Sequence, residues 1–91
     1  MKLLLVEDEK RMAQALIEIL RLEKYDVDHS GNGLEAIEMI KSDLYDVIVL
    51  DVMLPGKSGF EIAKAARQKG IKTPILMLTA RNELDDKVLG L

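Results

Sequence analysis

The stretch Val47-Ile48-Val49-Leu50-Asp51 is an unbroken apolar run that ends in a carboxylate. A short run without polar alternation is typical of a strand buried on both faces, as in a parallel sheet covered by helices. Leu3-Leu4-Leu5-Val6 has the same character and is followed by the acidic pair Glu7-Asp8, and Ile75-Leu76-Met77-Leu78 is followed by Thr79. Polar residues therefore stand where the expected strands end.

The segments between these runs have helical periodicity. Apolar residues recur at spacings of three and four between positions 12 and 20, 34 and 40, and 60 and 66, which predicts amphipathic helices. The sequence therefore alternates strand and helix, and right-handed crossovers on one parallel sheet are the expected connection. The expected strands are Lys2–Val6, Tyr25–His29, Asp46–Leu50 and Ile75–Leu78. We predict an α/β fold, a doubly wound parallel sheet with strand order 2-1-3-4.

Three carboxylates are predicted to meet at one edge of this sheet. Strands 1 and 3 are neighbours in the expected order, so Glu7, Asp8 and Asp51 would emerge side by side at their carboxyl ends, where open α/β sheets bind ligands. Carboxylates without a basic neighbour repel one another, and a hard cation such as Mg²⁺ relieves that repulsion. The pattern indicates a divalent-metal site around Asp51. For Asp8 alone, a helix cap is the alternative explanation.

Local signals predict how the helices begin and end. Ser58 and Glu61 have the spacing of a capping box at a helix start. Gly70 is placed to end that helix, and Asn82 could cap a final one. His29, the only histidine, has no partner His or Cys nearby in sequence. We interpret it as a surface residue at a strand end and not as a catalytic or metal-binding residue.

The composition narrows the possible functions. The chain has 91 residues, a formal net charge of −3 from 13 basic and 16 acidic residues, and no cysteine. One small domain is expected, without disulfides or thiolate metal sites and without the clustered basic residues of a nucleic-acid surface. No apolar run approaches the roughly 18 residues of a membrane span. A soluble cytoplasmic protein without membrane or direct nucleic-acid contact is expected.

Four motifs in order give the chain a resemblance to a known family. They are Glu7-Asp8, Asp51, the loop Met53-Leu54-Pro55-Gly56 with Gly59, and Leu78-Thr79-Ala80-Arg81. In this order and spacing the whole chain resembles the receiver domain of two-component response regulators. The residues of the loop and of the last motif are most similar to those of regulators that carry a winged-helix DNA-binding domain.

The resemblance implies a signalling function and not an enzyme. Asp51 would accept a phosphoryl group from a sensor histidine kinase or from a small donor such as acetyl phosphate. Glu7, Asp8 and Asp51 would hold Mg²⁺ together with the Met53 backbone carbonyl. The Thr79 hydroxyl would turn toward the phosphoryl group and carry the switch to an output, which the resemblance implies is transcription regulation in the full-length protein.

The resemblance also implies that residues 1–91 are an incomplete receiver domain, the (βα)4 portion of a flavodoxin-like (βα)5 fold. The lysine that the family places after its fifth strand would lie beyond Leu91. A receiver-like interaction module without phosphoryl chemistry is therefore the alternative. Strand Ile75–Leu78 would be an open edge, and such edges pair with other chains. We expect self-association through this edge or by exchange of the terminal segment.

Two enzymes of doubly wound fold fit the sequence poorly. A phosphatase with an aspartate nucleophile typically has a second aspartate two positions later, where this chain has Met53. A flavin carrier needs a loop that cradles phosphate after its first strand, and Glu7-Asp8-Glu9 would repel phosphate instead.

Overall fold

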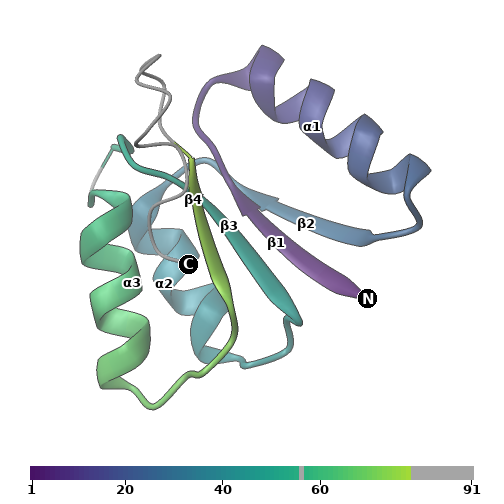
Figure 1. Ribbon diagram of the computed structural model, residues 1–91. Coiled ribbons are helices and arrows are strands. Elements are labelled where there is room, and N and C mark those ends of the chain that lie inside the picture. Colours follow the sequence, from purple (N-terminus) through teal and green to yellow (C-terminus); the bar gives the residue numbers. More distant parts are fainter. Residues whose placement is uncertain (56, 79–91) are drawn as a thin grey trace.

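The structure is a computed structural model that describes residues 1–55 and 57–78. Strands and helices alternate along the chain, and α1 lies on one side of the sheet while α2 and α3 lie on the other (Figure 1). The elements are β1 (Lys2–Val6), α1 (Lys10–Leu22), β2 (Asp26–Ser30), α2 (Gly33–Lys41), β3 (Val47–Asp51), α3 (Gly59–Gln68) and β4 (Ile75–Leu78). The final helix expected from Asn82 lies outside the described residues.

The strands form one parallel sheet in the order β2-β1-β3-β4, which confirms the predicted doubly wound topology. Two strands begin and end one residue later than predicted. The Tyr25 amide still closes α1 by donating to the Leu20 carbonyl, so the β2 ladder begins when Asp26 donates to Met1. At the other end of the sheet, Asp51 remains in β3 because it pairs with Leu78.

The two faces of the sheet form separate cores because side chains alternate along each strand. On the α1 face, Leu3 and Leu5 pack with Ala13. On the opposite face, Leu4 packs with residues of α2 and α3, including Ile62. Every residue of the central apolar runs is therefore covered, which explains why neither run alternates with polar residues.

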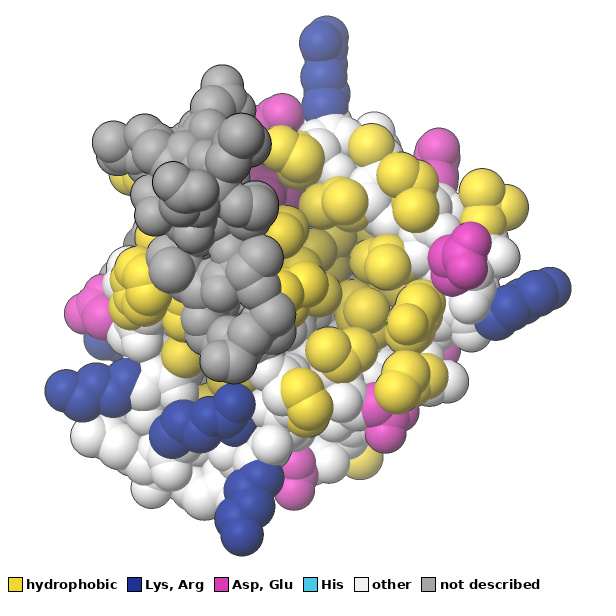
Figure 2. Space-filling view, in the orientation of Figure 1, with side chains coloured by type: hydrophobic (Ala, Val, Ile, Leu, Met, Phe, Trp, Pro, Cys, Tyr) yellow, Lys and Arg dark blue, Asp and Glu magenta, His cyan; other side chains and the backbone are white. Residues whose placement is uncertain are grey.

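The α1 face is the less completely covered of the two. Figure 2 shows hydrophobic side chains gathered across the part of the surface where α1 crosses the sheet. Met12, Ile19 and Leu22 of α1 are exposed, and Leu16 and Leu20 beside them are only partly buried. Among the described helices, none is long and apolar enough to cross a membrane.

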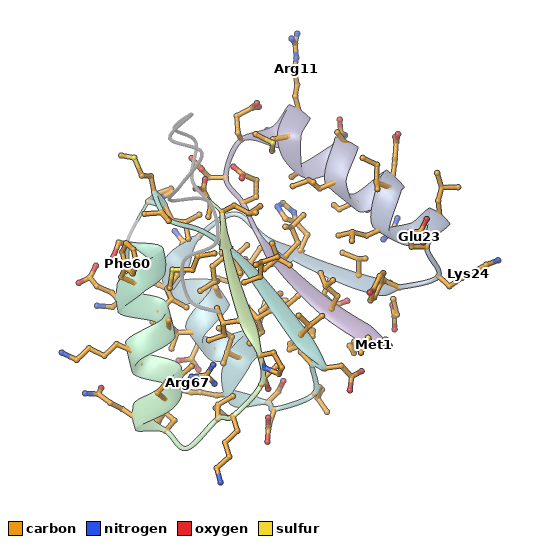
Figure 3. The ribbon with its side chains drawn as sticks, in the orientation of Figure 1. Met1, Arg11, Glu23, Lys24, Phe60 and Arg67 are labelled. Atoms are coloured by element: carbon orange, nitrogen blue, oxygen red, sulfur yellow. The ribbon has the colours of Figure 1, made fainter. Side chains whose placement is uncertain are left out.

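Helix α3 begins and ends as the sequence predicts. The Ser58 hydroxyl accepts from the Glu61 amide, and the Glu61 carboxylate accepts from the Ser58 amide at 3.0 Å. The hydrogen bond from the Ser58 amide holds the pKa of Glu61 below its usual value. Gly70 follows the helix with a φ of 82°, a conformation that glycine adopts without strain. Arg67 then donates to the Ile71 and Thr73 carbonyls, both at 2.8 Å, and fixes the approach to β4 (Figure 3).

Candidate metal and phosphoryl site

The acidic residues predicted to converge do so. Glu7 and Asp8 follow β1, Asp51 ends β3, and one carboxylate oxygen of each lies within 4.8 Å of the others. Adjacent central strands place these residues together at the carboxyl edge of the sheet. Glu7 and Asp51 are only 4% and 7% exposed, whereas Asp8 is exposed. Two buried acids and one accessible acid therefore share one small volume.

Backbone amides fix the two buried carboxylates. The Met53 amide donates to Asp51 Oδ1 at 3.2 Å, and the Glu9 amide donates to Glu7 Oε2 at 3.0 Å. Helix α1 is capped by Glu9, whose carboxylate accepts from the Arg11 amide at 2.8 Å. The alternative interpretation of Asp8 as the cap is therefore wrong, because the cap lies one residue later. The Asp8 carboxylate is left available to the acidic cluster.

The electrostatics of the cluster disfavour full ionisation. Burial raises the pKa of Glu7 above its usual value, and the nearby charges of Asp51 and Asp8 raise it further, while the Glu9 amide opposes this shift. Within the described residues, no Lys or Arg forms an ion pair with these acids. Among the described residues, no basic side chain neutralises the negative charge of the cluster.

A cavity of about 530 Å³ opens beside the cluster. Its acidic part is formed by Glu7, Asp8, Glu9 and Asp51, and its apolar part by Met12, Leu16, Met53 and Leu78. The volume is large enough for a hydrated cation together with a phosphoryl group, and the carboxylates are reachable from it. The acidic end of the cavity therefore offers the oxygen ligands that a divalent cation prefers.

Of the remaining predicted site residues, the structure describes Met53 but not Thr79. The Met53 side chain is 65% exposed, and its amide already contacts Asp51; the role of its carbonyl as a metal ligand stays a prediction. Thr79, predicted as the switch hydroxyl, lies outside the described residues. So does Gly56 of the loop.

Sequence reasoning missed one contact of the site. His29 Nε2 lies 2.8 Å from the Glu7 carbonyl oxygen, although the sequence indicated only a surface residue at a strand end. Nothing in the local sequence predicts this contact, because it depends on the register of β2 against β1.

Comparison with known proteins identifies the family. Residues 3–91 match the response regulator receiver domain family. The chain belongs to this family. The receiver domain is 45% identical over 91 residues to the transcriptional regulatory protein DltR of Streptococcus agalactiae, which covers the whole chain and 41% of DltR. It thus spans about two fifths of the length of that relative.

Two solved structures resemble the receiver domain closely. One is the response regulator TrrA from Thermotoga maritima in complex with Mg²⁺-BeF, with 36% identity, a TM-score of 0.83, and coverage of 93% of this chain and 77% of that one. The other is the receiver domain of the sensor histidine kinase PA1611 from Pseudomonas aeruginosa, with a magnesium ion in its active-site cleft. Its identity is 30% and its TM-score 0.84, with coverage of 93% of this chain and 71% of that one. Similarity at this level supports the flavodoxin-like fold predicted from the sequence.

Proposed function

We propose that this receiver domain accepts a phosphoryl group on Asp51 in a Mg²⁺-dependent reaction. The observation that carries the proposal is the convergence of Glu7, Asp8 and Asp51 within 4.8 Å, without an ion pair to a basic residue among the described residues. Phosphoryl transfer needs mainly positioning and charge neutralisation, and this cluster offers a nucleophile beside a cation site.

The donor set fits Mg²⁺. This ion prefers oxygen ligands and keeps several waters, so a few carboxylates suffice. Glu7, Asp8 and Asp51 would hold it directly or through waters, with the Met53 carbonyl as a further ligand. When bound, the ion supplies positive charge that offsets the repulsion between the carboxylates and the phosphoryl oxygens.

Asp51 would act as the nucleophile. The Met53 amide donates a hydrogen bond to Oδ1 and fixes the orientation of this carboxylate, which lines the cavity. A carboxylate oxygen forms a new P–O bond as the bond between phosphorus and the donor breaks. With the phosphohistidine of a sensor histidine kinase as donor, the P–N bond breaks and the imidazole leaves with the electron pair. With acetyl phosphate, the P–O bond to the acetyl group breaks and acetate leaves with the electron pair.

The output proposed for a longer protein with this receiver domain rests on the name of a relative. DltR is named a transcriptional regulatory protein, so we assign transcription regulation to the longer protein and not to residues 1–91. Thr79 would respond to the phosphoryl group as the switch hydroxyl. No catalytic turnover is assigned to the chain, since Asp51 itself is modified.

Magnesium titration followed by amide NMR tests the site. The wild type should bind with a dissociation constant on the order of millimolar, because an open site with few carboxylates binds Mg²⁺ weakly. Asp8→Asn and Asp51→Asn should each weaken binding, while Glu38→Gln, at an exposed position of α2 beside Lys41, should not. Equal Mg²⁺ affinity in the wild type and all three variants would show that the acidic cluster is not the metal site.

Beryllofluoride with Mg²⁺ separates the two functional alternatives. A phospho-accepting receiver should bind beryllofluoride, with large shifts around Asp51 that are lost in Asp51→Asn. An interaction module without phosphoryl chemistry would bind Mg²⁺ but not beryllofluoride. Saturating Mg²⁺ with no beryllofluoride response would therefore favour that module.

We also propose that the 91-residue chain self-associates through the outer edge of β4. Within the described residues, β4 pairs only with β3. Its sequence Ile75-Leu76-Met77-Leu78 is apolar throughout, and an apolar strand with a free edge tends to pair with another chain.

A further inference from the structure

The Glu7 backbone lies where the β1–β2 ladder runs out. Its amide donates to the Ser30 carbonyl at 3.0 Å, one step beyond the last register pair, Val6 with Ser30. In a regular parallel ladder, the Glu7 carbonyl would next accept from the amide of Asn32. That amide instead donates to the Ser30 hydroxyl at 3.3 Å. The ladder therefore leaves the Glu7 carbonyl without its usual donor.

The His29 side chain supplies the missing donor. Its Nε2 lies 2.8 Å from the Glu7 carbonyl oxygen, and a carbonyl can only accept, so Nε2 carries the hydrogen. Both backbone polar groups of Glu7 are thus held by the last two residues of β2. One bond comes from the strand backbone and the other from a side chain.

The end of β2 is itself well anchored. Ser30 is 1% exposed, and its hydroxyl lies 2.7 Å from Glu35 Oε1 on α2. A Cβ added to Gly31 would lie 3.6 Å from the Glu7 carbonyl oxygen and 3.7 Å from the Asp8 Cα. The turn after β2 therefore packs directly against the backbone of the acidic pair. The end of β2, from which His29 donates its hydrogen bond to Glu7, is therefore held in place.

We propose that His29 is a positioning residue of the metal site, which it serves by fixing the peptide that joins Glu7 to Asp8. The Glu7 carbonyl and the Asp8 amide belong to the same peptide plane, so a bond to that carbonyl sets the direction in which both acidic side chains leave the backbone. The proposal rests on the Mg²⁺ site of the proposed function and adds a residue to it.

Loss of the hydrogen bond from His29 to the Glu7 carbonyl should weaken Mg²⁺ binding without abolishing it. Removing outer partners of metal ligands typically costs about 10- to 100-fold in affinity. His29 acts through the backbone and its side chain is exposed, so we expect the lower end, about 10-fold. The ligands themselves remain in place.

Three variants separate the hydrogen bond from the bulk and charge of the ring. His29→Leu removes the donor. His29→Gln restores an uncharged N–H the same number of bonds from Cα as Nε2, and His29→Asn places it one bond short. Mg²⁺ affinity by NMR titration should fall about 10-fold in the Leu and Asn variants and recover in His29→Gln.

A spectroscopic readout accompanies the titration. The Asp8 amide nitrogen is bonded to the Glu7 carbonyl carbon, so its ¹⁵N shift in metal-free protein should move in His29→Leu and return toward the wild-type value in His29→Gln. The Glu38→Gln variant serves as the unperturbed reference. If the Leu variant fails to fold, the comparison of Asn with Gln carries the test.

Unchanged affinity in His29→Leu and His29→Asn would overturn the proposal, as would equal weakening in the Gln variant. A wild type that binds no Mg²⁺ would instead overturn the proposed function, whatever the variants do. The two failures are therefore distinguishable in one series of titrations.

Discussion

Glu7 is a carboxylate whose surroundings disfavour its charge. Its raised pKa means that the folded protein holds the Glu7 proton more tightly than the unfolded chain does. The contribution to stability is fully present below the unfolded pKa and is lost as the pH rises through the folded pKa. At neutral pH without metal, the ionised residue therefore destabilises the fold.

Glu7→Gln should raise the free energy of unfolding of metal-free protein at pH 7, because it removes this unfavourable charge. The gain over the wild type should shrink as the pH falls below the usual range of Glu, where both side chains are neutral. Urea unfolding at several pH values measures it. With excess Mg²⁺ the order should reverse, since only the wild type retains every ligand; a gain that is independent of both pH and Mg²⁺ would contradict the argument.

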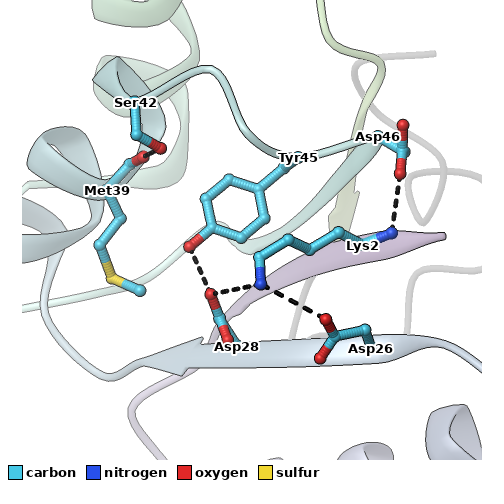
Figure 4. A network of polar contacts seen from close by, with 7 residues as sticks. All are labelled: Lys2, Asp26, Asp28, Met39, Ser42, Tyr45 and Asp46. Carbon is cyan, nitrogen blue, oxygen red and sulfur yellow. Dashed lines mark hydrogen bonds and ion pairs between the residues drawn. The ribbon is translucent and has the colours of Figure 1, made fainter.

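Tyr45 belongs to a second polar cluster, which lies near the amino ends of β1 and β2 (Figure 4). Its hydroxyl donates to Asp28 Oδ2 at 2.7 Å, and Lys2 Nζ lies 3.4 Å from Asp26 and 3.5 Å from Asp28. Burial, with the bond and the charge of Asp28, raises the pKa of Tyr45 to about 12. Stability from this group is therefore present below pH 10 and lost as the pH rises through about 12.

Tyr45→Phe should lower the free energy of unfolding at neutral pH by about 1 kcal/mol, the usual worth of one hydrogen bond. The change in tyrosine absorbance near pH 12, which reports the ionisation of Tyr45, should be lost in this variant. Mg²⁺ affinity should stay unchanged, because the acidic cluster lies at the carboxyl ends of the strands, away from Tyr45. Tyr25→Phe, which leaves Asp28 untouched, is the control; loss of the same step in that variant would contradict the assignment.

The start of α3 is packed against the end of β3. The Gly59 amide donates to the Val52 carbonyl at 2.8 Å. A Cβ at Gly59 would lie 2.5 Å from the Asp51 carbonyl oxygen and 3.1 Å from the Val52 Cα. Only a residue without a side chain allows this approach, so the start of α3 lies directly against the backbone of Asp51, the proposed nucleophile.

Gly59→Ala should therefore cost about 1–3 kcal/mol of stability, the usual range for overpacking, and should weaken Mg²⁺ binding by displacing Asp51. Gly31→Ala is the matched control, because its Cβ would meet its nearest neighbour at an ordinary 3.6 Å; we expect a change within about 0.5 kcal/mol. Thermal unfolding and Mg²⁺ titration of both variants measure the difference. Similar losses in the two would show that the close approach at Gly59 is not responsible.

The sequence predicted the elements well where one physical signal dominates. Unbroken apolar runs marked β1 and β3, and the convergence of their carboxyl ends predicted the acidic cluster. Contacts that depend on a shift of one residue were not predictable. Whether Asp8 or Glu9 caps α1 depends on the turn between them, and the His29 bond depends on where β2 leaves the ladder.

The two faces of the sheet are covered unevenly by helices. Two helices pack on one face and α1 alone on the other within the described residues. The apolar surface of Figure 2 lies on the α1 face. The alternation of strands and helices predicted the layers, but the extent of this surface depends on how far α1 reaches across the sheet.

Among the described strands, β4 pairs only with β3 and leaves its outer side unpaired. If the 91-residue chain pairs through this edge, its sedimentation coefficient and melting temperature should rise with concentration, because association stabilises the folded state by mass action. Leu76→Lys places a charge on the partly buried edge strand, and charged edges resist pairing. This variant should sediment as a monomer and melt independently of concentration.

Leu44→Lys, at an exposed position outside the strands, is the control and should still associate. Association that persists in Leu76→Lys would favour exchange of the terminal segment, and a wild-type monomer at every concentration would contradict both forms of self-association.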